Sequence, residues 1–224
     1  LIDGPAGGYS LESLLPEAPK YGILIVYTST PTFANDVMVA NAMKEANPEL
    51  LIGFCGAHVM INWESSMAAS PHIDFVCDKE FDFTIKEVCE GKPLAEVNGL
   101  YYRRGDEVVK SGERDIIHDM DTLPWVTPIY KKFLDPKNYY NGYMLHPYMS
   151  LYTGRGCKSR CTYCLWPQTI SGHNYRTRSV KDIAAEIAYA LKEFPEVKEF
   201  FFDDDTLTDN IEHVEALALE LGKL

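Results

Sequence analysis

The sequence has no long apolar run and little positive charge. No stretch approaches the roughly 18 to 20 consecutive apolar residues that a membrane-spanning helix needs, and the apolar run at 22–27 is far too short. Lys and Arg number 21 against 33 Asp and Glu, so the formal net charge is −12. Because nonspecific nucleic-acid binding depends on a basic surface, this balance argues against a nucleic-acid partner.

The sequence also lacks the features of a secretory leader. It opens without an initiator Met, a basic segment or an apolar core, so no signal peptide is predicted. The sequence has six cysteines, and its composition agrees with a cytoplasmic protein whose thiols stay reduced. A length of 224 residues permits one or two domains.

Three of the six cysteines lie together in the spacing Cys-x3-Cys-x2-Cys. Cys157, Cys161 and Cys164 directly follow a loop-like Gly-Arg-Gly at 154–156. A cubane iron–sulfur cluster takes four thiolates, so three cysteines on one loop leave one iron open to another ligand. Zinc is the alternative, with His173 as a fourth ligand, since zinc sites also use closely spaced cysteines and a later histidine. A disulfide framework is disfavoured because one thiol would be left over.

The other three cysteines, Cys55, Cys77 and Cys89, stand singly in apolar runs. Free cysteine in such a setting behaves as a small buried hydrophobe. We therefore expect all three to lie in cores.

The cysteine loop resembles the signature of radical S-adenosylmethionine (SAM) enzymes, in which an aromatic residue, here Tyr163, precedes the last cysteine. The resemblance implies that Cys157, Cys161 and Cys164 hold a 4Fe-4S cluster whose open iron binds SAM. Reduction of this cluster cleaves SAM to methionine and a 5′-deoxyadenosyl radical, while the protein positions the cofactor. It also implies an external electron donor of the flavodoxin or ferredoxin type.

The segment before the cysteines looks like the cobalamin-binding domain of one large subclass. Within this subclass, Cys-Leu-Trp-Pro-Gln at 164–168 and Gly-His-Asn-Tyr-Arg-Thr-Arg-Ser at 172–179 look like the hopanoid-biosynthesis-associated members, of the bacteriohopanetetrol cyclitol ether synthase type. The resemblance implies radical rearrangement of a hopanoid lipid head group to a cyclitol ether. It leaves room for contact of the full-length enzyme with a membrane surface.

Strand and helix signals alternate along the first half, which is typical of a parallel α/β layer. Short apolar runs predict strands at 23–27, 50–55 and 73–77. Helical spacing predicts a helix from 33 to the stop at Asn47-Pro48 and another at 83–90. Three strand–helix units predict an open, Rossmann-like sheet, in which ligands bind at the carboxyl ends of the strands.

Hydroxyl, glycine and charged residues gather at and after the ends of these strands. The resemblance implies that they contact cobalamin, whereas N-capping hydroxyls and turn glycines explain each one separately. The candidates are Thr28, Ser29, Thr30, Gly53, Gly56, His58, Lys79 and Glu80.

The motif Asp-x-His-x-x-Gly, which marks a histidine ligand to cobalt in related domains, is absent, so no histidine is expected on cobalt. By resemblance, residues 1–3 look like the end of the second strand of a domain whose first strand is missing. We therefore expect the chain to be a fragment of a longer enzyme, truncated at both ends.

The middle of the chain predicts a β-hairpin at 97–109, turning at Gly105-Asp106. A proline- and aromatic-rich segment at 119–136 reads as an extended linker. We expect a cobalamin-binding domain at 1–120, a linker at 121–145 and the N-terminal part of a radical SAM barrel at 146–224.

The second half predicts a strand at 148–153, a helix at 180–193 with Ser179 as its N-cap, and a strand at 197–202. This order opens a (β/α) barrel, whose sites lie at the carboxyl ends of strands. The resemblance implies SAM contact at these ends, whereas acids at the start of a helix over 209–224 are the alternative. The SAM candidates are Tyr163, Asp203, Asp204 and Asp205, and Arg155, Arg176 and Arg178 are candidates for an anionic group, with solvent exposure as their alternative.

The sequence therefore predicts an α/β protein with a Rossmann-like cobalamin-binding domain followed by the start of a radical SAM barrel. Its expected cofactors are a 4Fe-4S cluster, SAM and cobalamin, and its expected substrate is a small molecule or a lipid head group. Two alternatives stay open. One is a cobalamin-dependent radical SAM methyltransferase, and the other is a zinc-stabilised binding module without redox chemistry.

Overall fold

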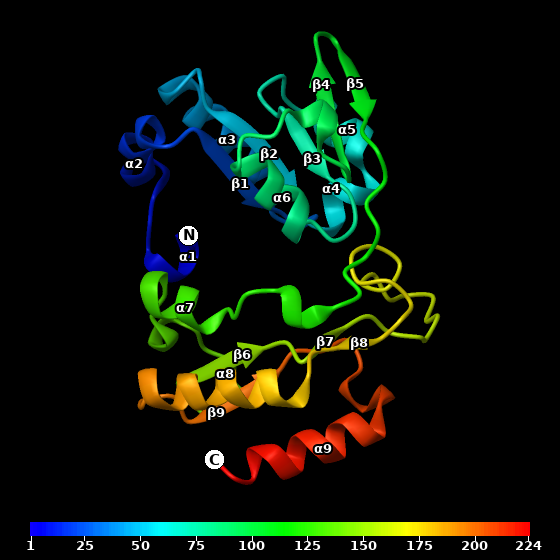
Figure 1. Ribbon diagram of the computed structural model, residues 1–224. Coiled ribbons are helices and arrows are strands. Elements are labelled where there is room, and N and C mark those ends of the chain that lie inside the picture. Colours follow the sequence, from blue (N-terminus) through cyan, green and yellow to red (C-terminus); the bar gives the residue numbers. More distant parts are fainter. The chain divides into compact units, whose positions relative to one another are not determined.

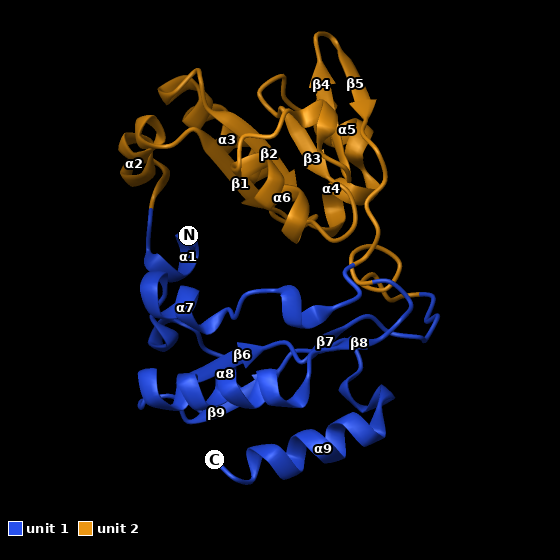
Figure 2. Cartoon of the chain, viewed as in Figure 1, with its two compact units in different colours: residues 1–9, 117–162, 172–224 blue, residues 10–116, 163–171 orange.

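The computed structural model describes residues 1–224, which divide into two compact units (Figure 2). Unit 1 comprises residues 1–9, 117–162 and 172–224, and unit 2 comprises residues 10–116 and 163–171. Unit 1 contains Cys157 and Cys161 of the cysteine motif, and unit 2 contains Cys164.

Unit 2 contains a five-stranded sheet in the order β1-β2-β3-β4-β5 (Figure 1). β1 (Ile23–Tyr27), β2 (Leu51–Cys55) and β3 (Phe75–Cys77) run parallel, while β4 (Leu100–Arg104) and β5 (Glu107–Lys110) form an antiparallel hairpin beside β3. β2 and β3 are buried almost throughout, as expected for apolar runs in a parallel sheet. The predictions of three parallel strands and of the hairpin are confirmed.

Helices cover both faces of this sheet. Because side chains alternate along a strand, one face packs against α3 (Phe33–Ala46), α4 (Ala57–Ile61) and α5 (Trp63–Ala68), and the other packs against α6 (Asp82–Cys89). The sequence pattern predicted α3 and α6 but not α4 and α5, which are too short to show a helical period. Shorter helical turns lie at α2 (Leu11–Leu14), Leu15–Lys20 and Leu94–Glu96.

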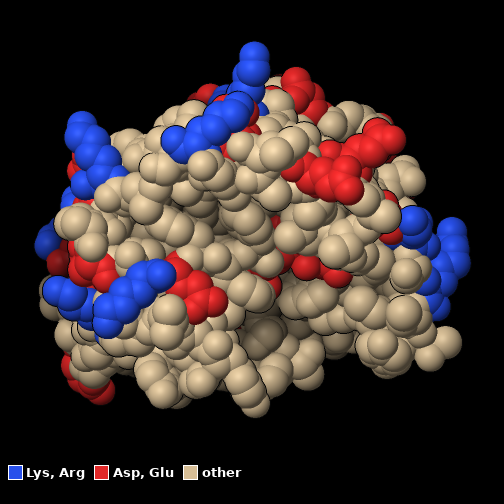
Figure 3. All heavy atoms as spheres, turned by 90° about the horizontal axis from the view of Figure 1, so that it is seen from below, with Lys and Arg blue, Asp and Glu red and all other residues tan.

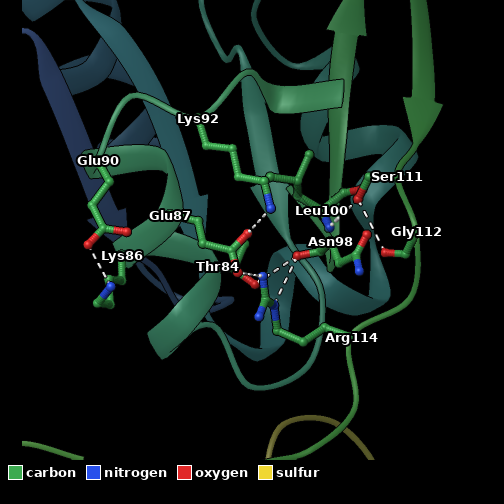
Figure 4. Close-up of polar contacts among 10 residues, drawn as sticks. All are labelled: Thr84, Lys86, Glu87, Glu90, Lys92, Asn98, Leu100, Ser111, Gly112 and Arg114. Atoms are coloured by element: carbon green, nitrogen blue, oxygen red, sulfur yellow. Dashed lines mark hydrogen bonds and ion pairs between the residues drawn. The ribbon is translucent and has the colours of Figure 1, made fainter. Parts of the chain in front are cut away.

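A polar network around Arg114 ties α6 to the chain on both sides of the hairpin (Figure 4). Arg114 donates from Nη2 to Glu87 Oε1 at 2.6 Å and from Nε to the Asn98 carbonyl at 3.1 Å. The Thr84 hydroxyl donates to the same carbonyl at 3.0 Å, and Lys92 lies 2.8 Å from Glu87 Oε2. The hydrogen bonds from Lys92 and Arg114 lower the pKa of the Glu87 carboxyl below its usual value.

Unit 1 contains a second parallel pair, β6 (Tyr148–Leu151) and β9 (Glu199–Phe202). α8 (Val180–Glu193) joins them in sequence and lies along the pair (Figure 1), and α9 (Ile211–Leu221) packs into the same apolar core. The predicted helix at 180–193 is confirmed, and the Ser179 hydroxyl accepts a hydrogen bond from Asp182 N at 3.3 Å. A small antiparallel pair follows β6, made of β7 (Gly154–Arg155) and β8 (Arg176–Thr177), and short 3-10 turns lie at Met120–Thr122, Pro136–Asn138 and Leu207–Asp209.

The predicted extended linker is wrong in its centre, where α7 (Thr127–Phe133) forms. Its proline lies in the first helical turn, where a missing N–H costs no hydrogen bond. Trp125 Nε1 donates to Asp182 at 2.8 Å, and Thr127 N donates to Glu186 at 3.1 Å. The segment is therefore anchored to α8 and is more than a connector.

Two further expectations are corrected. Residues 1–3 form no strand, because Asp3 instead caps α1 (Gly4–Gly7) by accepting from Ala6 N at 3.1 Å. Cys55 and Cys77 are buried in the sheet core as predicted, but Cys89 is exposed because the last turn of α6 presents it to solvent. None of the helices is both long enough and apolar enough to cross a lipid bilayer.

Candidate functional site

The carboxyl ends of β6 and β9 lie at the same edge, because the two strands run parallel. The chain after β6 is fastened to the chain after β9 through Asp204. Its Oδ1 accepts from Thr153 N at 2.7 Å, and its Oδ2 accepts from the Tyr175 hydroxyl at 2.7 Å and from the Thr153 hydroxyl. Burial is the largest cause that raises the pKa of Tyr175, and the carboxylate of Asp204 raises it further.

The first cysteine lies at the next step of this junction. Gly156 N donates to Asp205 Oδ2 at 2.9 Å, and the Thr206 hydroxyl lies 2.8 Å from Cys157 Sγ. Lys158 forms an ion pair with Asp209 at 2.6 Å. The start of the cysteine loop is therefore docked onto the segment after β9.

Hydrogen bonding lowers the pKa of the Cys157 thiol. The hydrogen bond from the Thr206 hydroxyl is the main cause, and hydrogen bonds from the backbone N–H and the hydroxyl of Ser159 lower the pKa further. Burial and the negative charge of Asp205 act in the opposite direction and raise the pKa. A lowered pKa favours the thiolate, which is the form that binds metals.

The three loop cysteines differ in their surroundings. Cys157 is buried, Cys161 is exposed and Cys164 is half-buried, and none of the three forms a disulfide. The chemistry of the donor set suits an iron–sulfur cluster with one open iron, since it offers three cysteines outside disulfides, of which Cys157 is biased toward the thiolate. However, no three Cys, His, Asp or Glu side chains are gathered as a metal-binding group, either with His173 or without it.

The SAM candidates divide into two kinds. Tyr163 is 90% exposed and Asp203 is exposed, whereas Asp204 and Asp205 already accept hydrogen bonds from the loop after β6. The alternative role at a helix start is not seen, because Asn210 caps α9 by accepting from His213 N at 3.0 Å.

The arginine candidates are largely committed to the protein interior. Arg178 is 8% exposed and lies 2.6 Å from both Asp182 and Glu186. Arg176 is also 8% exposed and donates to the Ile117 carbonyl. The solvent-exposed alternative is therefore wrong for both, because Arg178 forms ion pairs inside the protein and Arg176 bonds to a backbone carbonyl. Arg155 lies half-buried in β7. In the view of Figure 3, basic and acidic side chains form small separate groups among uncharged residues.

The loops after β1 and β2 meet at the edge of the unit 2 sheet. Thr30 Oγ1 lies 3.0 Å from His58 Nδ1, and the buried Thr28 hydroxyl donates to Asp36 at 2.7 Å. Gly56 has φ of +113°, and a Cβ there would lie 2.4 Å from the Thr28 carbonyl oxygen. Glycine is therefore required where these two loops cross.

The remaining cobalamin candidates have varied surroundings. A Cβ on Gly53 would lie 2.1 Å from the Phe75 ring, so packing within the sheet accounts for this glycine. After β3, Lys79 is exposed with φ of +54°, and Glu80 is 2% exposed. The Tyr27 and Phe81 rings lie 6.3 Å apart, which places the loop after β3 beside the end of β1.

Sequence reasoning missed Thr206, Tyr175 and Thr153. Thr206 directly follows the aspartate triplet, and this position at a strand end was the one available signal. Nothing in the sequence marked Tyr175 or Thr153 as partners of Asp204, because the pairs are 29 and 51 residues apart.

No protein-family model matches the chain. It is 28% identical over 216 residues to an uncharacterised methyltransferase of Pyrococcus horikoshii, covering 94% of this chain and 46% of the relative. It is 24% identical over 179 residues to the anaerobic magnesium-protoporphyrin IX monomethyl ester cyclase of Synechocystis, covering 75% and 33%. It is 30% identical over 103 residues to the cytidylyl-2-hydroxyethylphosphonate methyltransferase of Streptomyces wedmorensis, covering 44% and 19%.

The fold is similar to a solved structure of the radical SAM methyltransferase TsrM from Kitasatospora setae, with cobalamin and a [4Fe-4S] cluster bound. The TM-score is 0.67 at 13% identity, and the match covers 94% of this chain and 42% of TsrM. The α/β architecture with a parallel β1-β2-β3 sheet is thus shared with TsrM.

The chain is homologous to enzymes, namely methyltransferases and a cyclase. It spans less than half the length of each of these relatives. They support the methyltransferase alternative better than the hopanoid-modifying prediction, which finds no support among them.

Proposed function

We propose that the chain is part of a cobalamin-dependent radical SAM methyltransferase. The observation that carries the proposal is the docked cysteine loop, in which three cysteines outside disulfides follow a parallel strand and Cys157 contacts the segment after β9 through Thr206. Homology to methyltransferases and the fold shared with TsrM support it.

In this proposal Cys157, Cys161 and Cys164 hold the cluster, and Asp204 and Asp205 fix the loop by accepting its hydrogen bonds. When bound, the cluster, SAM and cobalamin would supply electron transfer, the methyl group and a carrier for it. Tyr163 and Asp203 are exposed and are proposed to contact SAM.

The crossing loops of unit 2 are the proposed cobalamin surface. Gly56 allows the loops after β1 and β2 to approach, and Thr30 and His58 lie together there. Ser29, Lys79 and Glu80 belong to the same edge of the sheet. We further propose that a flavodoxin- or ferredoxin-type protein reduces the cluster and that the methyl acceptor is a small molecule.

Anaerobic reconstitution of the whole protein tests this function. We expect about four irons per chain and an EPR signal of the reduced cluster that changes when SAM enters the open iron. Cys161→Ala should abolish assembly, whereas Cys89→Ala, which removes another exposed thiol, should leave it intact. Zinc without iron in the purified protein would overturn the proposal in favour of the binding module.

A further inference from the structure

The Thr206 side chain contacts the sulfur of a proposed cluster ligand from the segment after β9, whereas the other hydrogen bonds to this sulfur come from Ser159 within the cysteine loop. Its hydroxyl lies 2.8 Å from Cys157 Sγ and 2.7 Å from the Asp205 carbonyl oxygen, so one proton has two acceptors within reach. A metal-bound cysteine is a thiolate, which carries negative charge and no proton of its own. Because charge-assisted hydrogen bonds are the stronger ones, the hydroxyl then donates to the sulfur.

The surrounding contacts hold this pair in place. Gly156 N donates to Asp205, and Lys158 pairs with Asp209, so anchors lie immediately before and after Cys157 along the loop. Cys157 is 9% exposed, and water therefore competes weakly for its sulfur. The contact is part of the docking of the loop onto the segment after β9.

A hydrogen bond to a cluster thiolate has a defined redox consequence. Reduction adds one electron to the cluster and makes its sulfurs more negative, so a donor stabilises the reduced form more than the oxidised form. Hydrogen bonds to the sulfurs are among the features that set cluster potentials. A donor at Cys157 therefore raises the reduction potential.

We propose that Thr206 is a positioning residue that raises the reduction potential of the cluster bound by Cys157. This inference rests on the proposed function. It assigns Thr206 a role in setting how strong a reductant the cluster needs, separate from the binding of SAM or cobalamin.

The test is a potentiometric titration of the reconstituted whole protein, with the reduced cluster followed by EPR and dithionite or titanium(III) citrate as the one-electron reductant. Thr206→Val keeps the shape of the side chain and removes the hydroxyl, so we expect a more negative midpoint. At the wild-type midpoint potential, the ratio of reduced to oxidised cluster should fall by about threefold, since a hydrogen bond to a charged group contributes only modestly.

Two variants separate this effect from a general loosening of the loop. Thr206→Ser keeps a hydroxyl and should restore the wild-type midpoint. Tyr175→Phe removes a hydroxyl from the neighbouring Asp204 anchor, where it does not contact sulfur, and should leave the midpoint unchanged.

The outcomes are distinguishable. A negative shift in Thr206→Val alone, with wild-type iron and sulfide content, supports the inference. Equal midpoint potentials in wild type and Thr206→Val overturn the inference, and so does an equal shift in Tyr175→Phe. Loss of iron in Thr206→Val with retention in Thr206→Ser also overturns it, because Thr206 would then be needed for cluster assembly. A wild-type protein that takes up no iron overturns the proposed function itself.

Discussion

Substituting Gly56 with Ala tests the crossing of the two loops at the proposed cobalamin surface. The backbone there has φ of +113° and ψ of 166°, a conformation almost confined to glycine, and an L-residue in it costs about 1 to 3 kcal/mol. The new Cβ would also lie 2.4 Å from the Thr28 carbonyl oxygen. The obstacle is backbone rather than a flexible side chain, so relief requires the loops to separate, at a further cost of about 1 to 3 kcal/mol.

We therefore expect Gly56→Ala to lower the free energy of unfolding by about 2 to 6 kcal/mol in urea titrations followed by circular dichroism. Gly91→Ala is the matched control, because Gly91 has φ of +84° but nothing lies within 4 Å of its added Cβ. The two variants share a positive φ, and the difference between them includes the contact with the Thr28 carbonyl, which only Gly56→Ala makes. If Gly56→Ala costs no more than Gly91→Ala, the reasoning about the close approach is refuted.

Three further predictions concern buried charge, pH and cobalt. Glu186→Ala should lower the free energy of unfolding by about 3 kcal/mol, because it leaves the buried Arg178 with one fewer ion-pair partner. Glu215→Ala, at an exposed position, is the control and should change the free energy of unfolding little. Equal losses in the two variants would contradict the role of the ion pair. Hydrogen bonds from Lys92 and Arg114 lower the pKa of the Glu87 carboxyl in the folded protein. They therefore stabilise the fold fully at pH values above the pKa of about 4.5 that Glu87 has in the unfolded chain, and this stabilisation is lost as the pH falls through the lower pKa of the folded protein. In Glu87→Gln the free energy of unfolding should fall less over this pH range than in wild type, as measured by acid unfolding. An unchanged dependence on pH would contradict the role of these hydrogen bonds. His58→Ala should leave the visible spectrum of bound cobalamin base-off, and a shift would identify the histidine as the cobalt ligand.

Local signals predicted the regular elements well. The helix at 180–193 was predicted to the residue, because Ser179 is a strong N-cap and apolar residues recur at helical spacing behind it. The parallel strands were found from short apolar runs, and their order placed the candidate loops at one edge. The helix at α7 was missed because its proline reads as a breaker unless its place in the first turn is known.

The partners within the site could not be predicted from sequence. Asp204 and Asp205 looked free for a ligand, yet both accept hydrogen bonds from residues 49 to 51 positions earlier. Such pairs are set by the register of β6 against β9, which no local pattern encodes. Cys89 was misplaced for the related reason that an apolar run does not say which side of a short helix faces solvent.

The docking of the cysteine loop onto the segment after β9 has a consequence for biosynthesis. The groups that hold Cys157 in place, at positions 205 and 206, leave the ribosome 48 to 49 residues after it. At a translation rate of about 5 to 20 residues per second, roughly 2 to 10 seconds pass between synthesis of Cys157 and synthesis of the residues that hold it in place. Under the proposed function, cluster delivery to a loop of fixed shape therefore follows completion of the β6–α8–β9 unit, and a pause in translation before β9 would lengthen the time during which the loop cysteines are open to oxidation.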